Sequence, residues 1–179
     1  MSEEKEITEY SFEDLDIKDD LLRGIYSYGF EKPSNIQYKS LPIFDSGKDM
    51  IAQSQSGTGK TGAFSIGVLN NIDTGVKKTQ YIILTPTHEL AKQIYGVIGN
   101  LGEKMDISIC KVIGKTNIRD SISELQRDPQ IIVATPGRLF DMINKRHVFT
   151  DNIKTLVLDE ADEMLSIGFM DILQDIIKC

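Results

Sequence analysis

The chain has little cysteine, no tryptophan and no long apolar run: its 179 residues include 2 Cys, 5 Pro and 0 Trp. Cys110 and Cys179 stand apart without metal-ligand spacing, so we expect free thiols in a reducing compartment, the cytoplasm or, as an alternative, the nucleus. No segment approaches the roughly 18 apolar residues of a membrane span, and the acidic N-terminus does not resemble a signal peptide. His88 and His147 also lack partners at metal spacing. These absences argue against a disulfide-stapled secreted domain, a zinc protein and a membrane protein.

The net charge of −7 is concentrated at the N-terminus. Residues 1–20 hold nine carboxylates and two lysines, which accounts for the whole excess and leaves the rest of the chain neutral. We therefore expect residues 1–9 to be a solvated, mobile tail and residues 10–179 to form one domain. A neutral body argues weakly against a broad electrostatic platform for nucleic acid, but it leaves open binding through oriented backbone amides.

Short β-rich runs alternate with helical stretches along the chain, which predicts βαβ units around a parallel sheet covered by helices on both faces. Strands are expected at residues 50–53, 80–85, 107–113, 130–135 and 155–159. Helices are expected at residues 61–72, 89–101, 118–127 and 139–145.

Two of these strands end in the same way, with Thr85-Pro86 and with Thr135-Pro136. Threonine suits a helix N-cap and proline suits the first helical position, so we expect a helix to start at once in both places. Two such helix N-termini at one sheet edge could bind successive phosphates. The alternative is that the dipeptide only starts helices.

One loop has the composition of a phosphate-binding loop. Its residues are Ser54, Gln55, Ser56, Gly57, Thr58, Gly59, Lys60 and Thr61. The glycines allow backbone N–H groups to wrap phosphates, Lys60 would neutralise the outer two, and Thr61 offers a hydroxyl to a magnesium ion. Ser54 stands where the pattern has glycine, and the alternative interpretation is a glycine-rich turn.

About a hundred residues later, Asp159-Glu160-Ala161-Asp162 follows an apolar run. A strand-end carboxylate such as Asp159 can face a metal ion while its neighbour Glu160 orients the attacking water. A charged strand end that only faces solvent is the alternative. The two segments together predict a nucleotide site.

The segment 29–37 has no chemistry that its composition makes obvious. Phe30 alone reads as a core residue and Gln37 as a helix-surface residue, although a glutamine amide can bond to adenine and an aromatic ring can stack on it.

Taken together, these motifs resemble those of the DEAD-box RNA helicases, and within them the eukaryotic initiation factor 4A group. The resemblance runs from residue 11 to the C-terminus. It rests on Phe12 and on residues 29–37, 54–61, 86–91, 135–138 and 159–162. It implies a RecA-like P-loop core that is the N-terminal domain of an ATP-dependent RNA helicase, an ATP hydrolase.

The resemblance also assigns roles to residues. Phe30, Lys32 and Gln37 would contact the adenine end of ATP, residues 54–61 its phosphates, Thr61 and Asp159 the magnesium, and Glu160 the water. The expected catalytic residues are Lys60, Asp159 and Glu160. The RNA backbone would lie along Pro86, Thr87, His88, Gly114, Lys115, Thr135, Pro136, Gly137 and Arg138. Binding would be sequence-independent and salt-dependent. A scaffold protein is a further expected partner, and no oligomer is expected.

The chain departs from the family pattern at four positions. His88 replaces an arginine, so an imidazole stands where the family pattern has a permanently charged guanidinium. Lys115 replaces the second glycine of a Gly-Gly pair, Ser54 an alanine, and Ile167 an arginine.

The resemblance further implies that the chain stops before the family's Ser-Ala-Thr strand, which lies between the phosphate-loop strand and the strand of Asp159. The second RecA-like domain, with its arginine fingers, would also be absent. Such fingers contribute about 10³–10⁵ in rate, so we expect weak hydrolysis from this chain alone. The competing hypotheses are a non-catalytic nucleotide- or RNA-binding module, and a P-loop ATPase unrelated to RNA.

Overall fold

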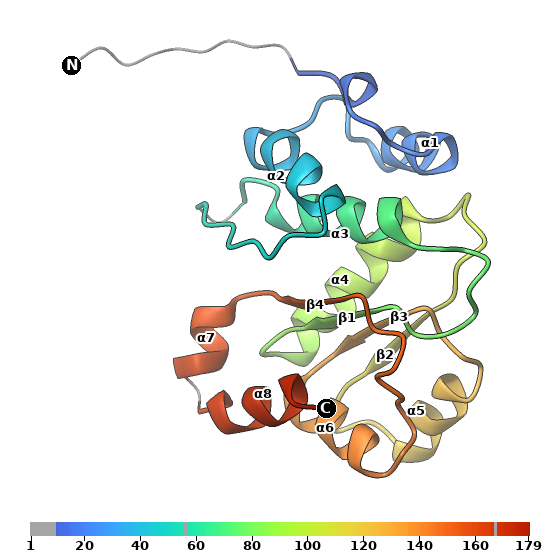
Figure 1. Ribbon diagram of the computed structural model, residues 1–179, viewed down its shortest axis with the longest axis vertical. Coiled ribbons are helices and arrows are strands. Elements are labelled where there is room, and N and C mark those ends of the chain that lie inside the picture. The colour runs from blue at the N-terminus through green and yellow to red at the C-terminus, as the bar shows by residue number, and fades with distance from the viewer. Residues whose placement is uncertain (1–9, 56, 167) are drawn as a thin grey trace.

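A parallel four-stranded sheet forms the centre of the molecule (Figure 1). The computed structural model describes residues 10–55, 57–166 and 168–179, so the expected tail 1–9, Ser56 and Ile167 lie outside it. The strands are β1 (Tyr81–Leu84), β2 (Ile109–Val112), β3 (Ile131–Ala134) and β4 (Thr155–Leu158). Their spatial order is β2-β3-β1-β4, and every pair is parallel.

Helices cover both faces of this sheet, as Figure 1 shows. The helical segments are η1 (Phe12–Asp14), α1 (Asp19–Tyr28), α2 (Asn35–Asp45), α3 (Lys60–Asn71), α4 (His88–Leu101), α5 (Ile118–Leu125), α6 (Pro136–Asn144), α7 (Ala161–Ser166) and α8 (Met170–Ile177). Alternate strand residues point to opposite sides. Tyr81 and Ile83 pack in the core with α1, α3 and α4, while Ile82 and Leu84 pack in the core with α6 and α8. The predicted α/β architecture is confirmed.

The expected strand at 50–53 does not form. Residues 50–55 have no helical or strand structure, and Ile51 is 99% exposed. A strand needs a neighbour for its backbone N–H and C=O groups, and within the described residues β4 pairs only with β1. The run 50–53 pairs with none of the described strands, so this prediction was wrong.

The helix after β1 begins at His88, one residue before the expected 89, but Thr85-Pro86 does not start it, so that part of the prediction was wrong. Thr85 continues the strand, because its N–H donates to Ala134 O at 3.0 Å. Its hydroxyl donates to Thr87 O at 2.9 Å. Thr87 is the N-cap of α4, and its Oγ1 accepts from Leu90 N at 3.3 Å. After β3, by contrast, Thr135 is the N-cap position and Pro136 the first residue of α6, as predicted.

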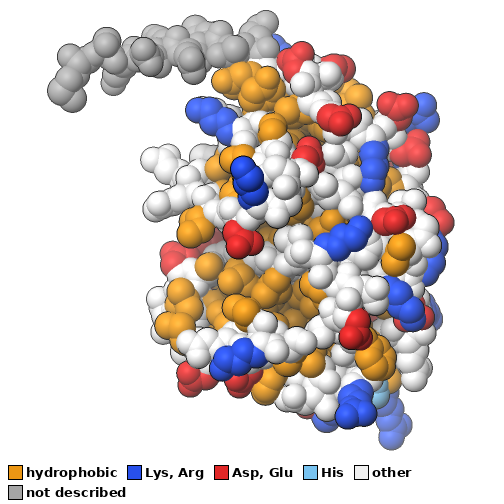
Figure 2. Space-filling model, in the orientation of Figure 1, with side chains coloured by type: hydrophobic (Ala, Val, Ile, Leu, Met, Phe, Trp, Pro, Cys, Tyr) orange, Lys and Arg blue, Asp and Glu red, His pale blue; other side chains and the backbone are white. Residues whose placement is uncertain are grey.

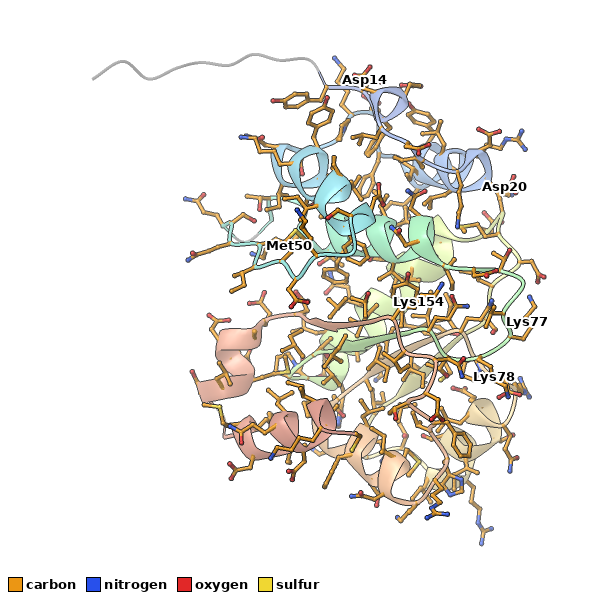
Figure 3. The ribbon with its side chains drawn as sticks, viewed as in Figure 1. Asp14, Asp20, Met50, Lys77, Lys78 and Lys154 are labelled. Atoms are coloured by element: carbon orange, nitrogen blue, oxygen red, sulfur yellow. The ribbon has the colours of Figure 1, made fainter. Side chains whose placement is uncertain are left out.

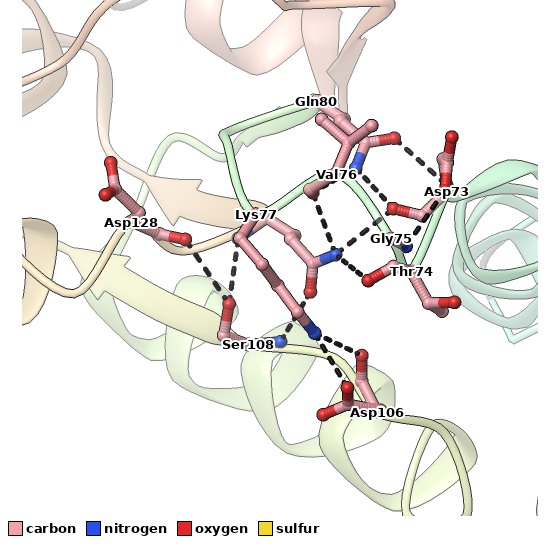
Figure 4. Close-up of polar contacts among 10 residues, drawn as sticks. Asp73, Thr74, Gly75, Val76, Lys77, Gln80, Asp106, Ser108 and Asp128 are labelled. Carbon is pink, nitrogen blue, oxygen red and sulfur yellow. Dashed lines mark hydrogen bonds and ion pairs between the residues drawn. The ribbon is translucent and has the colours of Figure 1, made fainter.

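Two fully buried glutamines organise the sheet edge where the strands begin (Figure 4). Gln80 Nε2 donates to Asp73 O at 2.7 Å and to Val76 O at 2.9 Å. Gln130 Nε2 reaches the same two carbonyls at 3.2 and 3.1 Å, and its Oε1 accepts from Ser108 N at 3.1 Å. Buried amides are stable only when paired in this way. The turn after α3 is thus fixed to the sheet.

Candidate functional site

Two glycines shape the loop that leads into α3. Gly57 and Gly59 have φ of 79° and 99°, a region that side chains with a Cβ rarely adopt. A Cβ on Gly59 would lie 2.8 Å from Ser34 Oγ and 2.9 Å from Gln37 Nε2. Glycine is therefore required here twice, by the backbone conformation and by the close approach of α2. The free N–H groups at the start of α3 point to an anion site.

Gln37 is 3% exposed and joins α2 to this loop, so its reading as a helix-surface residue was wrong. Ser34 N donates to Gln37 Oε1 at 2.9 Å, and Gln37 N donates to Ser34 Oγ at 3.5 Å. This reciprocal pair is a capping box at the start of α2. Gln37 Nε2 also donates to Gly59 O at 3.3 Å. The Ser-x-x-Gln spacing was the signal in the sequence that pointed to this burial.

Lys60, the first residue of α3, folds back over its own loop. Its Nζ donates to Ser54 O at 2.6 Å and to Gln55 O at 3.3 Å. Thr58 Oγ1 donates to Gln55 O at 2.7 Å and lies 2.6 Å from Ser54 Oγ. The ammonium group thus lies among the loop carbonyls, in the place where a positive charge would meet phosphates.

Phe30 is half-buried and packs against the core on the α3 side of the sheet. Its ring edge lies 3.1 Å from the position of a Cβ on Gly62, and its centroid is 5.0 Å from that of Tyr28. Lys32 is exposed. Phe30 and Gln37 both approach Gly62, so they lie side by side near the phosphate loop. Their contact with adenine stays a prediction.

Asp159 and Glu160 follow β4 and face the phosphate loop. Asp159 N donates to Leu84 O at 2.9 Å, which extends the ladder beyond β4. Burial raises the pKa of Asp159, the negative charge of Glu160 raises it further, and the positive charge of Lys60 lowers it. Lys60 is therefore near enough to Asp159 to influence its carboxyl group. Glu160 has φ of 52°, a strained conformation for a residue with a Cβ, and such strain clusters at functional sites.

The residues present fit a magnesium nucleotide. Magnesium is usually held by one or two carboxylates together with phosphates and water. Asp159 supplies such a carboxylate, and Thr61 lies in the first turn of α3. Within the described residues, no cluster of three or more His, Cys, Asp or Glu could hold a metal by itself. This donor set is therefore suited to an ion that arrives with its phosphates.

The expected RNA-contacting residues lie together at the edge where β1, β2 and β3 end. His88 Nε2 is 3.1 Å from the position of a Cβ on Gly114. The N-termini of α4 and α6 follow the adjacent strands β1 and β3, so both open at this edge. Pro86, Thr135 and Pro136 are buried and shape the backbone, whereas Lys115 and Gly137 are exposed.

Lys115 adopts φ of 56°, the conformation that favours glycine. A glycine could take this conformation without strain, whereas Lys115 adds an exposed side chain to it. The sequence could not reveal this conformation, because a lysine does not favour it.

Arg138 is tied to the loop after β2 by contacts that the sequence did not predict. Its guanidinium donates to Thr116 O at 3.2 Å and to Ser121 Oγ at 3.4 Å. These bonds fix the side chain beside Gly114 and Lys115, and they link the start of α6 to α5.

A family model described as DEAD/DEAH box helicase matches residues 34–179. The chain belongs to this family. It is 52% identical over 168 residues to the ATP-dependent RNA helicase eIF4A of Pyricularia oryzae, which covers 94% of this chain and 42% of the relative. The predicted resemblance to DEAD-box helicases and the initiation factor 4A group is confirmed.

Solved DEAD-box structures share the fold. A DEAD box protein of Methanococcus jannaschii superposes with a TM-score of 0.89 at 37% identity, over 94% of this chain and 46% of that one. Saccharomyces cerevisiae Dbp5 bound to RNA and ADP BeF3 gives a TM-score of 0.87 at 37% identity, over 94% and 43%. This DEAD-box chain thus spans less than half the length of these relatives. None of its described helices has the length and hydropathy needed to cross a bilayer.

Proposed function

We propose that this chain is the ATP- and RNA-binding N-terminal domain, within residues 10–179, of a DEAD-box RNA helicase. The observation that carries the proposal is the loop before α3, where Gly57 and Gly59 adopt left-handed conformations and Lys60 Nζ lies on the carbonyl of Ser54 at 2.6 Å. A glycine-shaped loop, a lysine and a strand-end carboxylate are the parts that a P-loop site requires. Because the chain is similar to proteins named as initiation factors, we also propose that it acts in the cytoplasm.

Nucleotide binding would change the partners of Lys60. Its ammonium group would leave Ser54 O for the outer phosphates, and the N–H groups of residues 57–60 would take the phosphate oxygens. Thr61 and Asp159 would hold a magnesium ion, whose chemistry would be to neutralise charge on the phosphates. Glu160 would orient the attacking water from its strained position beside the metal ligand.

RNA would bind along the edge formed by His88, Gly114, Lys115 and Arg138. The helix N-termini of α4 and α6 offer free N–H groups to phosphates. Contacts of this kind do not read bases, so binding would be independent of sequence. Scaffold partners of the complete helicase stay a prediction from the resemblance.

Nucleotide binding is tested by Lys60→Ala. The loss of one charge-assisted contact to phosphate should lower the affinity for a fluorescent ATP analogue, measured with magnesium present, by about 10–100-fold. Lys104→Ala is the matched control, because Lys104 is an exposed lysine whose salt bridge is to its neighbour Glu103. Equal affinity in both variants would refute the nucleotide site.

RNA binding is tested by His88→Ala and Arg138→Ala. Each should lower the affinity for a single-stranded RNA of any sequence, and Arg138→Ala should also reduce the slope of affinity against salt by about one. Arg127→Ala, an exposed arginine at the opposite sheet edge, should change neither. Unchanged RNA affinity in all three would favour an ATPase unrelated to RNA.

Hydrolysis is tested separately. RNA-stimulated phosphate release from the chain is compared with that from Glu160→Gln, which keeps the size of the side chain and removes its charge. Release above the variant supports turnover by this domain, whereas equal release supports a binding module without turnover.

A further inference from the structure

A cavity of about 240 Å³ opens at the edge where the strands begin, away from the nucleotide and RNA site. Its lining includes Lys78, Ile122, Leu125, Arg146, Val148 and Phe149. Thr79 precedes β1, Asp128 precedes β3 and Asn152 precedes β4, whereas the site above lies where the strands end. In Figure 3, Lys78 lies on the opposite side of the view from Met50, which leads into the phosphate loop.

The size of the cavity suits one side chain. Pockets for drug-sized ligands measure about 300–1,000 Å³, so this one is too small for a nucleotide. Its apolar wall comes from Ile122, Leu125 and Val148, and Phe149 stands at the site with 65% of its surface exposed. An exposed aromatic ring beside an apolar pocket is a typical anchor point of a protein interface.

The charges at the cavity favour an acidic partner. Lys78 Nζ pairs with Asp128 Oδ1 at 3.0 Å, so these two charges offset each other. Within the described part of the chain, the guanidinium of Arg146 has no hydrogen bond or ion pair, and neither does the ring of His147. The lining therefore presents an unopposed cation above an apolar pocket.

Arg146 stands where a helix end favours glycine. His147 N donates to Met142 O at 2.8 Å and Arg146 N donates to Ile143 O at 2.9 Å, the bonding pattern of a Schellman motif after α6. Arg146 has φ of 58°, the left-handed conformation that such a motif requires. An arginine here destabilises the fold relative to glycine, so its presence calls for a role that a glycine lacks.

We propose that this cavity is a docking site for an extended segment of a partner protein. The segment places one leucine- or phenylalanine-sized side chain in the pocket and a flanking carboxylate against Arg146. The site goes beyond the proposed nucleotide and RNA functions, and it shares no residue with them.

The test uses a fluorescein-labelled peptide, Gly-Asp-Glu-Phe-Glu-Gly, titrated into the chain. Anisotropy should report saturable binding, and amide NMR shifts should map to residues around Thr79, Leu125 and Val148. A peptide with alanine for phenylalanine and one with lysine for each acid should both bind at least about tenfold more weakly. No binding, or shifts that map to the phosphate loop, would overturn the proposal.

Variants then separate docking from folding. Arg146→Glu should weaken the peptide by about tenfold, whereas Lys145→Glu should not, because Lys145 lies outside the cavity and pairs with Asp141 at 2.8 Å. Arg146→Gly should also weaken the peptide while raising the midpoint of thermal unfolding, since glycine relieves the left-handed strain. Equal effects of the two glutamate variants would refute the site.

Phe149→Ser, with the similarly exposed Ile177→Ser as its control, should reduce peptide affinity. A single-stranded RNA that shifts the same cavity amides more strongly than the peptide would also refute the proposal and assign the surface to nucleic acid.

Discussion

The two central strands and the flank beside β4 are built in different ways. All residues of β1 and β3 are buried, because each strand has a neighbour on both sides and helices on both faces. The residues of β4 are only partly buried, and Leu165 and Met170 nearby are exposed. Figure 2 shows hydrophobic side chains over this region of β4, α7 and α8. The edge where β1 and β3 end, which we propose binds RNA, is thus built mainly on ladder bonds, whereas the phosphate loop is held by side-chain contacts such as that of Gln37.

The largest expected effect tests this comparison directly. Ile83→Ala, in the buried centre of β1, should reduce the free energy of unfolding by about 2–5 kcal/mol, because it leaves a cavity in a packed core. Ile51→Ala should change it by less than about 0.5 kcal/mol. Urea unfolding measures both. A cost at Ile51 similar to that at Ile83 would show that the segment before the loop is buried in solution, and the comparison would fail.

The next effect concerns the contact between α2 and α3. A Cβ on Gly62 would lie 2.4 Å from Gln37 Nε2, so Gly62→Ala should cost about 1–3 kcal/mol and weaken nucleotide binding. Gly96→Ala in α4 is the matched control, since nothing lies within 4 Å of its Cβ position. It should stabilise the helix by about 0.5–1 kcal/mol. Thermal unfolding and nucleotide titration check both changes. A neutral result at Gly62 would contradict the close approach of α2.

The smallest expected effect on stability is at the edge where the strands begin, at an exposed ion pair near the buried glutamines Gln80 and Gln130. Lys77 Nζ pairs with Asp106 Oδ2 at 2.8 Å, and both side chains are more than half exposed (Figure 4). Lys77→Ala should cost about 0–1 kcal/mol, and less at high salt. Unfolding midpoints at low and high salt measure this. A larger loss that persists at high salt would mean that the ion pair, and not the buried glutamines, holds the turn 73–76.

The sequence predicted the central strands β1 and β3 better than the segment before the phosphate loop. The apolar runs at β1 and β3 have the composition of buried strands, and each of these strands pairs with a strand on both sides. The run at 50–53 has the same composition, but its pairing depends on a neighbour that composition does not reveal. The phosphate loop and the pair Asp159-Glu160 were found because their residue types are tied to one chemistry. The strain at Glu160, the left-handed backbone at Lys115 and the bonds of Arg138 depend on tertiary structure, which the local sequence does not reveal.

Gln37 joins the start of α2 to Gly59, the N-cap of α3. The side-chain nitrogen of Gln37 donates a hydrogen bond to Gly59 O, and the oxygen of the same amide accepts one from Ser34 N. A displacement of α2 would therefore be transmitted directly to the backbone of the phosphate loop, and no contact through the sheet would be needed. A ligand that packs against α2 would therefore also restrict the backbone of the phosphate loop.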